Sequence, residues 1–137
     1  MKWKNDIDEN VRSGIVELLI LKLLSEEKMY GYQIKQELSK RTGGVFVIKE
    51  GSLYGPLYRM FERKLISSEK ILVGEKRFRN YYCIEEAGRE YLEYGLAELS
   101  KVYRGVHELL NFHAEEQDEN ADDKEPEGDF LRDSEKL

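Results

Sequence analysis

Three consecutive segments in the middle of the chain constrain its fold most. Residues 30–41 and 52–64 have the apolar spacing of short amphipathic helices. Residues 66–73 and 78–84 carry β-branched and aromatic side chains typical of paired strands, and a charged turn joins them. Two short helices followed by a hairpin predict a winged helix-turn-helix, in a mainly α chain with a small β-hairpin (α+β).

Charge is segregated along the chain, so the net charge of −6 describes no part of it well. Residues 28–84 hold twelve Lys and Arg against five Asp and Glu, a net of +7. Residues 114–137 hold three Lys and Arg against eleven Asp and Glu, a net of −8. The basic middle is suited to binding phosphates, and the acidic tail, poor in apolar residues, is predicted to be disordered.

The second short helix is predicted to be the recognition element. Ser52 is expected to be its N-cap, and Pro56 is expected in its first turn, where the missing N–H matters little. Thr42-Gly43-Gly44 is predicted to end the helix before it. Ile34 and Leu38 of the first short helix are expected to face inward. The side of the second that lies opposite its polar side carries Leu53, Leu57, Met60, Phe61 and Lys64.

A longer helix is predicted on each side of these elements. Residues 9–25 are apolar nearly all round, which predicts burial on more than one side and, in so small a chain, a partner subunit. Residues 85–113 show the alternating steps of three and four that are typical of a coiled-coil seam. Gly95 and Gly105 would let a neighbour approach this helix closely.

The polar surface of the middle segment supplies the candidate DNA-binding residues. Arg59 and Arg63 are four residues apart and share one helix side, from which an arginine can bind guanine bidentately. The N–H groups beside Ser52 can bind a phosphate, and a basic hairpin tip can reach a minor groove. The predicted set is Tyr32, Ser52, Tyr54, Tyr58, Arg59, Arg63, Lys76, Arg77 and Arg79.

Each of these patterns also has a plainer interpretation. A charged hairpin tip is commonly a solvated loop, and the arginine side of the helix is an ordinary surface if Glu62 offsets an arginine. For any single tyrosine, a core position and a DNA contact are equally compatible with the sequence. A helix with a polar outward side next to a basic hairpin favours DNA binding.

No catalytic, metal or cofactor site is predicted. His107 and His113 are six residues apart, a poor spacing for one helical face, and Cys83 is distant in sequence. The sequence contains neither a glycine-rich phosphate loop after a strand nor an evident catalytic triad, so we do not expect an enzyme. No apolar run reaches membrane-spanning length, and the N-terminus lacks a signal peptide. We therefore expect a cytoplasmic protein that does not contact membranes.

Three motifs, in order and with matching spacing, resemble one known family. Met29-Tyr30-Gly31-Tyr32-Gln33-Ile34 resembles its Met-x-Gly-Tyr-x-Ile segment, and residues 51–60, which begin Gly-Ser-Leu-Tyr, resemble its recognition helix. Residues 77–82 resemble its basic wing ending in Tyr-Tyr, and residues 86–89 its Glu-Ala-Gly helix start. Over about residues 11–110, the chain resembles the PadR family of bacterial transcriptional regulators.

This resemblance implies a homodimer whose last helix, with help from the first, forms the interface. It also implies two winged heads that bind a pseudo-palindromic operator, usually as a repressor. The single short last helix resembles the compact subfamily. The interface residues that follow from this assignment are Ile15, Leu19, Leu92, Gly95, Leu99, Val102, Val106 and Leu109.

The resemblance also raises the question of a small aromatic effector. Multidrug-responsive members of the compact subfamily stack flat aromatic compounds on a tryptophan of the last helix. In this chain the matching position is Leu99, and the only tryptophan, Trp3, is near the other end. An effector site between the last helices and a plain coiled-coil interface both remain open. The candidate pocket residues are Tyr91, Tyr94, Leu99 and Tyr103.

Together these features predict four parts. They are a flexible N-terminus (1–8), a winged helix-turn-helix DNA-binding domain (9–84), a dimerisation helix (85–113) and an acidic disordered tail (114–137). The alternative function is a winged-helix protein-interaction module whose basic face is occupied by a protein partner or by its own tail. If the tail inhibits DNA binding, deleting it should raise DNA affinity at low salt.

Overall fold

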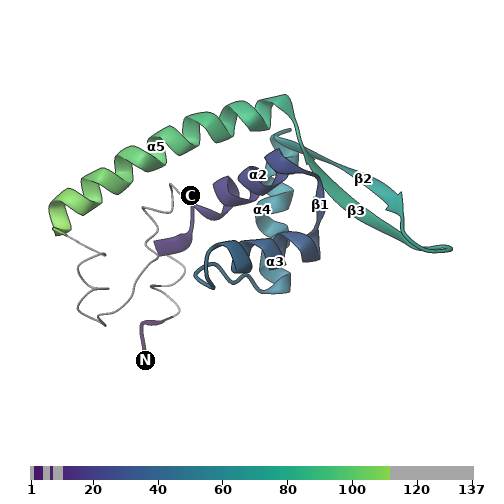
Figure 1. Ribbon diagram of the computed structural model, residues 1–137, viewed down its shortest axis with the longest axis horizontal. Helices are drawn as coiled ribbons and strands as arrows, with labels where there is room; N and C mark the ends of the chain where they lie inside the picture. Colours follow the sequence, from purple (N-terminus) through teal and green to yellow (C-terminus); the bar gives the residue numbers. More distant parts are fainter. Residues whose placement is uncertain (1, 5–6, 8–10, 112–137) are drawn as a thin grey trace. The chain divides into compact units, whose positions relative to one another are not determined.

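The structure, a computed structural model, describes residues 2–4, 7 and 11–111 (Figure 1). Helices and one small antiparallel sheet make an α+β fold, as the sequence predicts. Compact packing divides the chain between Ala97 and Glu98, part-way along the last helix. The elements in chain order are α2 (Val16–Glu26), β1 (Met29–Tyr30), α3 (Gly31–Arg41), α4 (Glu50–Glu62), β2 (Ile66–Leu72), β3 (Phe78–Ile84) and α5 (Glu86–Leu110).

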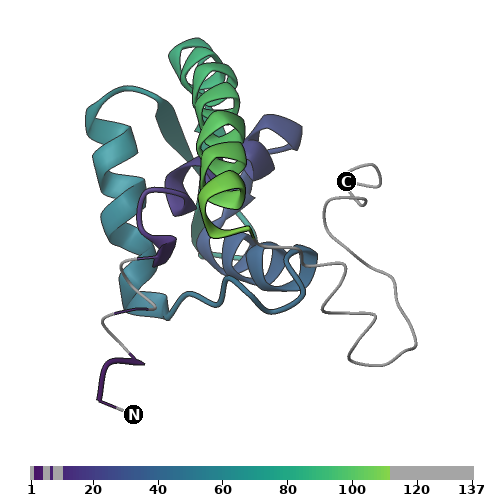
Figure 2. The same ribbon diagram turned by 90° about the vertical axis from the view of Figure 1, so that its left-hand side faces the viewer.

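Helices α2, α3 and α4 pack around one apolar core. Figure 2 shows α4 upright and α3 crossing it steeply, which is the arrangement of a helix-turn-helix. Ile20 and Leu21 of α2 are fully buried at its centre. Ile34 and Leu38 are buried as predicted, and so are Leu53, Leu57 and Met60 of the predicted stripe on α4. Phe61 of the same stripe is 46% exposed, and Lys64 lies beyond the end of α4 and is exposed.

The wing is an antiparallel sheet in the order β1-β3-β2. Strands β2 and β3 pair along all seven residues of each, and β1 adds two residues to the other edge of β3, with Tyr30 opposite Tyr81. Met29 and Ile66 are buried on the sheet face that covers the core. Because side chains alternate along a strand, Tyr30, Tyr81 and Arg79 lie on the opposite face.

The prediction of one unbroken helix over residues 9–25 is wrong. Residues 11 and 12 are helical, residues 13–15 form a turn, and α2 begins only at Val16. Gly14 has φ +90°, a conformation that interrupts a helix and that glycine adopts without strain. The first apolar residue of the predicted stripe, Val11, is exposed as a result.

The predicted start of the recognition helix is also wrong. Helix α4 begins at Glu50, and its N-cap, Lys49, makes no side-chain capping bond. Ser52 already lies in the first turn, where its N–H donates to the Lys49 carbonyl at 2.9 Å. Pro56 consequently lies inside the helix, where it removes the N–H that would otherwise donate to the Ser52 carbonyl.

Lys64, just after the C-cap of α4, has a strained backbone, and its replacement by glycine should change the stability of the protein. Leu65 N–H donates to the Met60 carbonyl at 2.9 Å, and Lys64 N–H donates to the Phe61 carbonyl at 3.0 Å, which is a Schellman motif. Lys64 has φ +63°, where glycine is preferred. Lys64→Gly is therefore expected to raise the free energy of unfolding by about 0.5–1 kcal/mol. Urea denaturation would measure the free energy of unfolding. The control is Lys64→Ala, which keeps a Cβ, and equal stability of the two variants would contradict the prediction.

Candidate nucleic-acid interface

The α3–α4 turn and the exposed side of α4 form the first part of the candidate interface. Gly43 and Gly44 both have positive φ and end α3, as predicted. On α4, the side opposite the core is exposed and includes Ser52, Gly55 and Tyr58, the last with 63% of its surface exposed. A hydrogen bond from the Tyr58 hydroxyl to the Glu62 carboxylate raises the pKa of Tyr58, so the hydroxyl stays protonated at neutral pH.

Arg59 of α4 and Arg63, the C-cap of α4, meet one carboxylate on α2, a contact that sequence spacing did not reveal. Arg59 Nε donates to Glu17 Oε2 at 3.0 Å, and Arg63 Nη1 lies 3.8 Å from Glu17 Oε1. The Arg63 guanidinium also stacks on the ring of Tyr91, 5.0 Å from its centroid. Arg59 Nη1 lies 3.5 Å from the position that a Cβ on Gly55 would occupy. Glu17 therefore directs the end of Arg59 along the exposed side of α4.

Tyrosines gather where α3 begins. Tyr32 is 55% exposed, and its hydroxyl accepts a hydrogen bond from Gln36 Nε2 at 3.0 Å. The Tyr54 hydroxyl lies 3.0 Å from where a Cβ on Gly31 would stand, so the glycine makes room for it. Burial and, to a lesser degree, the nearby Tyr54 raise the pKa of Tyr82. Tyr32 and Tyr54 both place a hydroxyl beside the N-terminus of α3.

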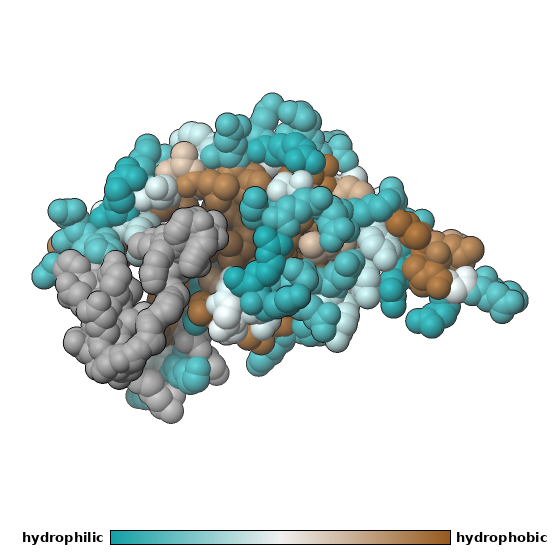
Figure 3. Space-filling model, viewed as in Figure 1, coloured by the Kyte–Doolittle hydropathy of each residue, from teal (hydrophilic) through white to brown (hydrophobic). Residues whose placement is uncertain are grey.

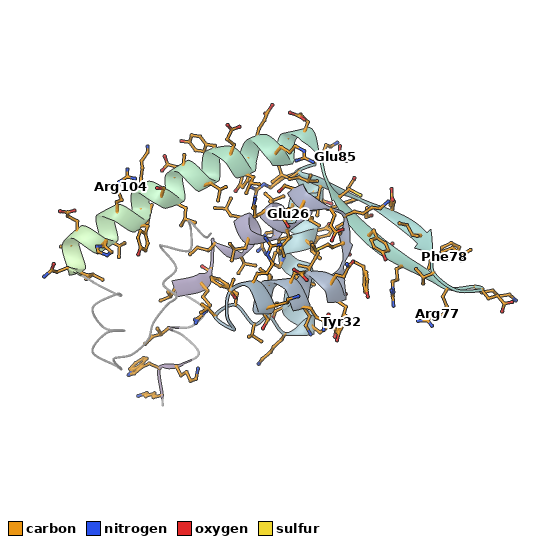
Figure 4. All side chains as sticks on the ribbon, in the orientation of Figure 1. Glu26, Tyr32, Arg77, Phe78, Glu85 and Arg104 are labelled. Carbon is orange, nitrogen blue, oxygen red and sulfur yellow. The ribbon has the colours of Figure 1, made fainter. Side chains whose placement is uncertain are left out.

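The wing carries its basic residues in two different environments. Lys76 and Arg77 are exposed at the hairpin tip, whereas Arg79 is half-buried against Tyr30. In Figure 4, Tyr32 and Arg77 point to the same side of the molecule, and Phe78 leaves the hairpin on the other side. The exposed apolar residues on the wing form the brown patch at the right of Figure 3, and they are Leu72, Val73 and Phe78.

Comparison with known proteins identifies the family to which this chain belongs. The model of the transcriptional regulator PadR-like family matches residues 20–94. An uncharacterized protein of Lysinibacillus sphaericus is 33% identical over 109 residues, 80% of this chain and 96% of that protein. The chain belongs to the PadR-like family of transcriptional regulators. As a PadR-like protein it belongs with regulators and not with enzymes, as predicted.

Solved structures agree with this assignment. A PadR-like transcriptional regulator from Bacillus cereus is 34% identical, with a TM-score of 0.65 over 76% of this chain and 99% of that one. Bacillus subtilis PadR in complex with operator DNA is 21% identical, with a TM-score of 0.57 over 61% of this chain and 46% of that one. At that identity the second likeness shows the winged-helix fold alone.

In the first part of its predicted seam, α5 packs against its own chain. Leu92 is 7% exposed and belongs to the core, so it is not available to a partner subunit. A Cβ on Gly95 would collide with the side chain of Leu18 on α2, so the close approach at this glycine is intramolecular. Leu92 and Gly95 of the predicted interface therefore contact their own chain, and periodicity alone cannot distinguish such a contact from one with a second subunit. Ile15 and Leu19 are half-buried in the same protomer.

The rest of the seam is largely exposed. Leu99 is half-buried, and the other three residues of the predicted stripe are exposed, namely Val102, Val106 and Leu109. Of the predicted pocket residues, Tyr91 lies under Arg63, Tyr94 is exposed, and the Tyr103 ring packs near His107 with centroids 5.7 Å apart. The structure thus gives these tyrosines separate neighbours.

The remaining sequence predictions concern metal ligands, the single cysteine, membrane-spanning helices and the acidic tail. Residues 2–4, 7 and 11–111 contain no group of three His, Cys, Asp or Glu able to hold a metal ion, and His113 lies outside this range. Burial raises the pKa of Cys83, which keeps its thiol protonated. Among the same residues, no helix combines the length and apolar content that crossing a bilayer requires. The acidic tail also lies outside the described residues.

Proposed function

We propose that this PadR-like regulator binds a pseudo-palindromic operator as a homodimer and represses transcription. The observation that carries the proposal is the shared orientation of Tyr32 and Arg77, which extend from the helix-turn-helix and from the wing to one side of the protomer (Figure 4). Such a surface suits a duplex that lies along both elements. The operator complex of the Bacillus subtilis PadR supports this use of the fold.

The proposed contacts divide by chemistry. Phosphates would be bound by the hydroxyls of Tyr32 and Tyr54 and by the wing cations Lys76, Arg77 and Arg79, which position the protein without reading sequence. Base edges would be read from the exposed side of α4, which enters the major groove. The base-reading candidates are Ser52, Tyr58, Arg59 and Arg63.

The salt dependence of binding tests the wing contacts. The protein would be titrated with DNA from upstream of its own gene at two salt concentrations. Arg77→Ala is expected to lower the slope of log affinity against log salt by about 0.9, because one phosphate contact is lost. Lys101→Ala removes an exposed charge of the same sign from α5 and serves as the control. An unchanged slope for Arg77→Ala would remove the wing tip from the proposed interface.

A second prediction concerns Glu17 as the residue that orients Arg59. Arg59→Ala is expected to weaken operator binding by roughly tenfold, the lower part of the range for an arginine that contacts bases. Glu17→Ala is expected to weaken it less, by about threefold, because the guanidinium remains but loses its 3.0 Å anchor. Because the Arg59 contact with Glu17, at 3.0 Å, is shorter than the Arg63 contact, at 3.8 Å, the double variant should bind nearly like Arg59→Ala. Additive losses would show that Glu17 does not act through Arg59.

The dimer and its regulation complete the proposal. The exposed turns of α5, assisted by Ile15 and Leu19, would pair two protomers, and a small aromatic effector bound near Tyr91, Tyr94, Leu99 and Tyr103 would release DNA. Release requires the effector to bind one dimer shape more tightly than the other. A titration of aromatic compounds followed by tyrosine and tryptophan fluorescence tests this. Failure of every such compound to bind specifically would leave a plain coiled-coil interface.

A further inference from the structure

Tyr30 lies outside the DNA-binding set that the sequence indicates, yet it contacts a wing cation closely. The Arg79 guanidinium carbon lies 4.1 Å from the centroid of the Tyr30 ring, well inside the range of a cation–π contact. The Tyr30 and Tyr81 rings meet edge to face, with centroids 5.3 Å apart and planes at 65°. Arg79 is half-buried in this cluster, whereas Lys76 and Arg77 at the tip are exposed.

The backbone holds the Tyr30 ring where the two DNA-binding elements meet. Tyr30 pairs with Tyr81 in the β1–β3 ladder, and its N–H donates to Gln33 Oε1 at 3.2 Å in the first turn of α3. The next residue, Gly31, is the one that makes room for the Tyr54 hydroxyl. The position of Tyr30 is therefore defined by the wing and by the helix-turn-helix together.

An arginine stacked on a ring still has its edge available for hydrogen bonding. When the flat face of a guanidinium lies on an aromatic ring, its N–H donors lie in the plane of the group and can bind a phosphate. Arg79 shares the sheet face of Tyr30 and Tyr81, which is opposite to the face that covers the core. A cation fixed before binding loses less conformational entropy when it meets DNA than a mobile one.

We propose that Tyr30 is a positioning residue for DNA binding, which acts by holding the Arg79 guanidinium in place for a phosphate of the operator. The proposal rests on the function proposed above and divides the wing into one pre-organised contact, Arg79, and two exposed contacts, Lys76 and Arg77. The expected benefit of ordering one side chain in advance is about two- to tenfold in affinity.

Binding measurements on four variants test the coupling. With DNA from upstream of the gene, Tyr30→Phe keeps the ring and should bind like the unaltered protein. Tyr30→Leu removes the ring and Arg79→Lys removes the planar guanidinium, and each should weaken binding by about two- to tenfold. Because the effect of Tyr30 passes through Arg79, Tyr30→Leu combined with Arg79→Ala should bind no more weakly than Arg79→Ala alone.

A matched control and a check of folding accompany these variants. Lys2 Nζ lies 5.1 Å from the Trp3 ring centroid in another cation–π pair, and neither residue belongs to the proposed interface. Trp3→Leu removes the ring of that pair and should leave DNA affinity unchanged. If circular dichroism shows that Tyr30→Leu does not fold, Arg79→Lys provides the same comparison, because it keeps the charge and loses the planar group.

Nuclear magnetic resonance of the protein without DNA tests the positioning role of Tyr30 separately from the proposed DNA binding. The Arg79 Nε–H signal, identified by its loss in Arg79→Lys, should show a ring-current shift that Tyr30→Phe preserves and Tyr30→Leu abolishes. If Tyr30→Leu abolished the shift and left DNA affinity unchanged, the positioning role would be overturned and the proposed function would remain intact. If the unaltered protein bound no DNA at low salt, both would fail, although the stack itself would still be visible.

Discussion

Replacing Gly88 by alanine is expected to destabilise the protein by about 2–4 kcal/mol, the largest stability effect that we expect from one added methyl group. A Cβ at this position would collide with the Leu65 carbonyl oxygen and lie 2.8 Å from Ile84 Cγ1. The carbonyl cannot move away easily, because it accepts the Glu85 N–H at 2.9 Å at the start of α5. The substitution therefore forces either α5 or the α4–β2 junction out of position.

The free energy of unfolding of Gly88→Ala would be measured by urea denaturation. Gly105→Ala, on the same helix, is the matched control, since nothing lies within 4 Å of the position of its Cβ. That control is expected to be neutral or to gain up to about 1 kcal/mol, because alanine favours a helix more than glycine does. Equal effects of the two substitutions would show that α5 does not approach the Leu65 carbonyl closely.

The two crossed helices and the hairpin were predictable because their signals are local. The spacing of Leu53, Leu57 and Met60 defines one side of a helix whichever protein surrounds it, and all three are buried. The pair Gly43-Gly44 marks a stop by its own conformational freedom. The two-residue β1 strand has no such signal, because it becomes a strand only by adding to β3.

The errors arise where a local pattern allows more than one outcome. Ser52 is a good capping residue, but α4 extends two residues beyond it to Glu50. An acidic residue in the first turn favours that earlier start, because it interacts well with the helix dipole. The stripe containing Leu92 and Gly95 is real, but its period says nothing about whether the neighbour is α2 of the same protomer or a second subunit.

The candidate DNA-binding site was predictable as a surface, but its internal connections were not. Residue types and periodicity placed Tyr58 on the exposed side of α4 and Arg77 at the wing tip. The contact between Glu17 and Arg59 joins residues 42 positions apart, and no local pattern indicates it. Tyr30 gave no separate signal, because its role depends on the register that brings β3 and Arg79 beside it.

Val106→Asp is expected to separate the proposed dimer and thereby to reduce operator affinity. Val106 is 49% exposed in the protomer, on the stripe that continues beyond Leu92 and Gly95. A carboxylate buried without a partner at a subunit interface costs several kcal/mol. Because two linked heads bind about 10²–10⁴ times more tightly than one, the variant should lose affinity by about that factor. Sedimentation and operator titration at the same protein concentrations would measure both effects.

Ser100→Asp distinguishes a disrupted interface from a simple increase in negative charge. Ser100 is exposed on the same helix but lies outside the stripe, and its hydroxyl accepts a hydrogen bond from Arg104 Nη1 at 3.2 Å, a contact that an aspartate can keep. This control should remain dimeric and bind DNA nearly normally, because both variants add one charge and only one of them adds it to the apolar stripe. If Val106→Asp remained dimeric, the exposed turns of α5 would not be the interface. If it became monomeric with unchanged affinity, one winged head alone would be sufficient for binding.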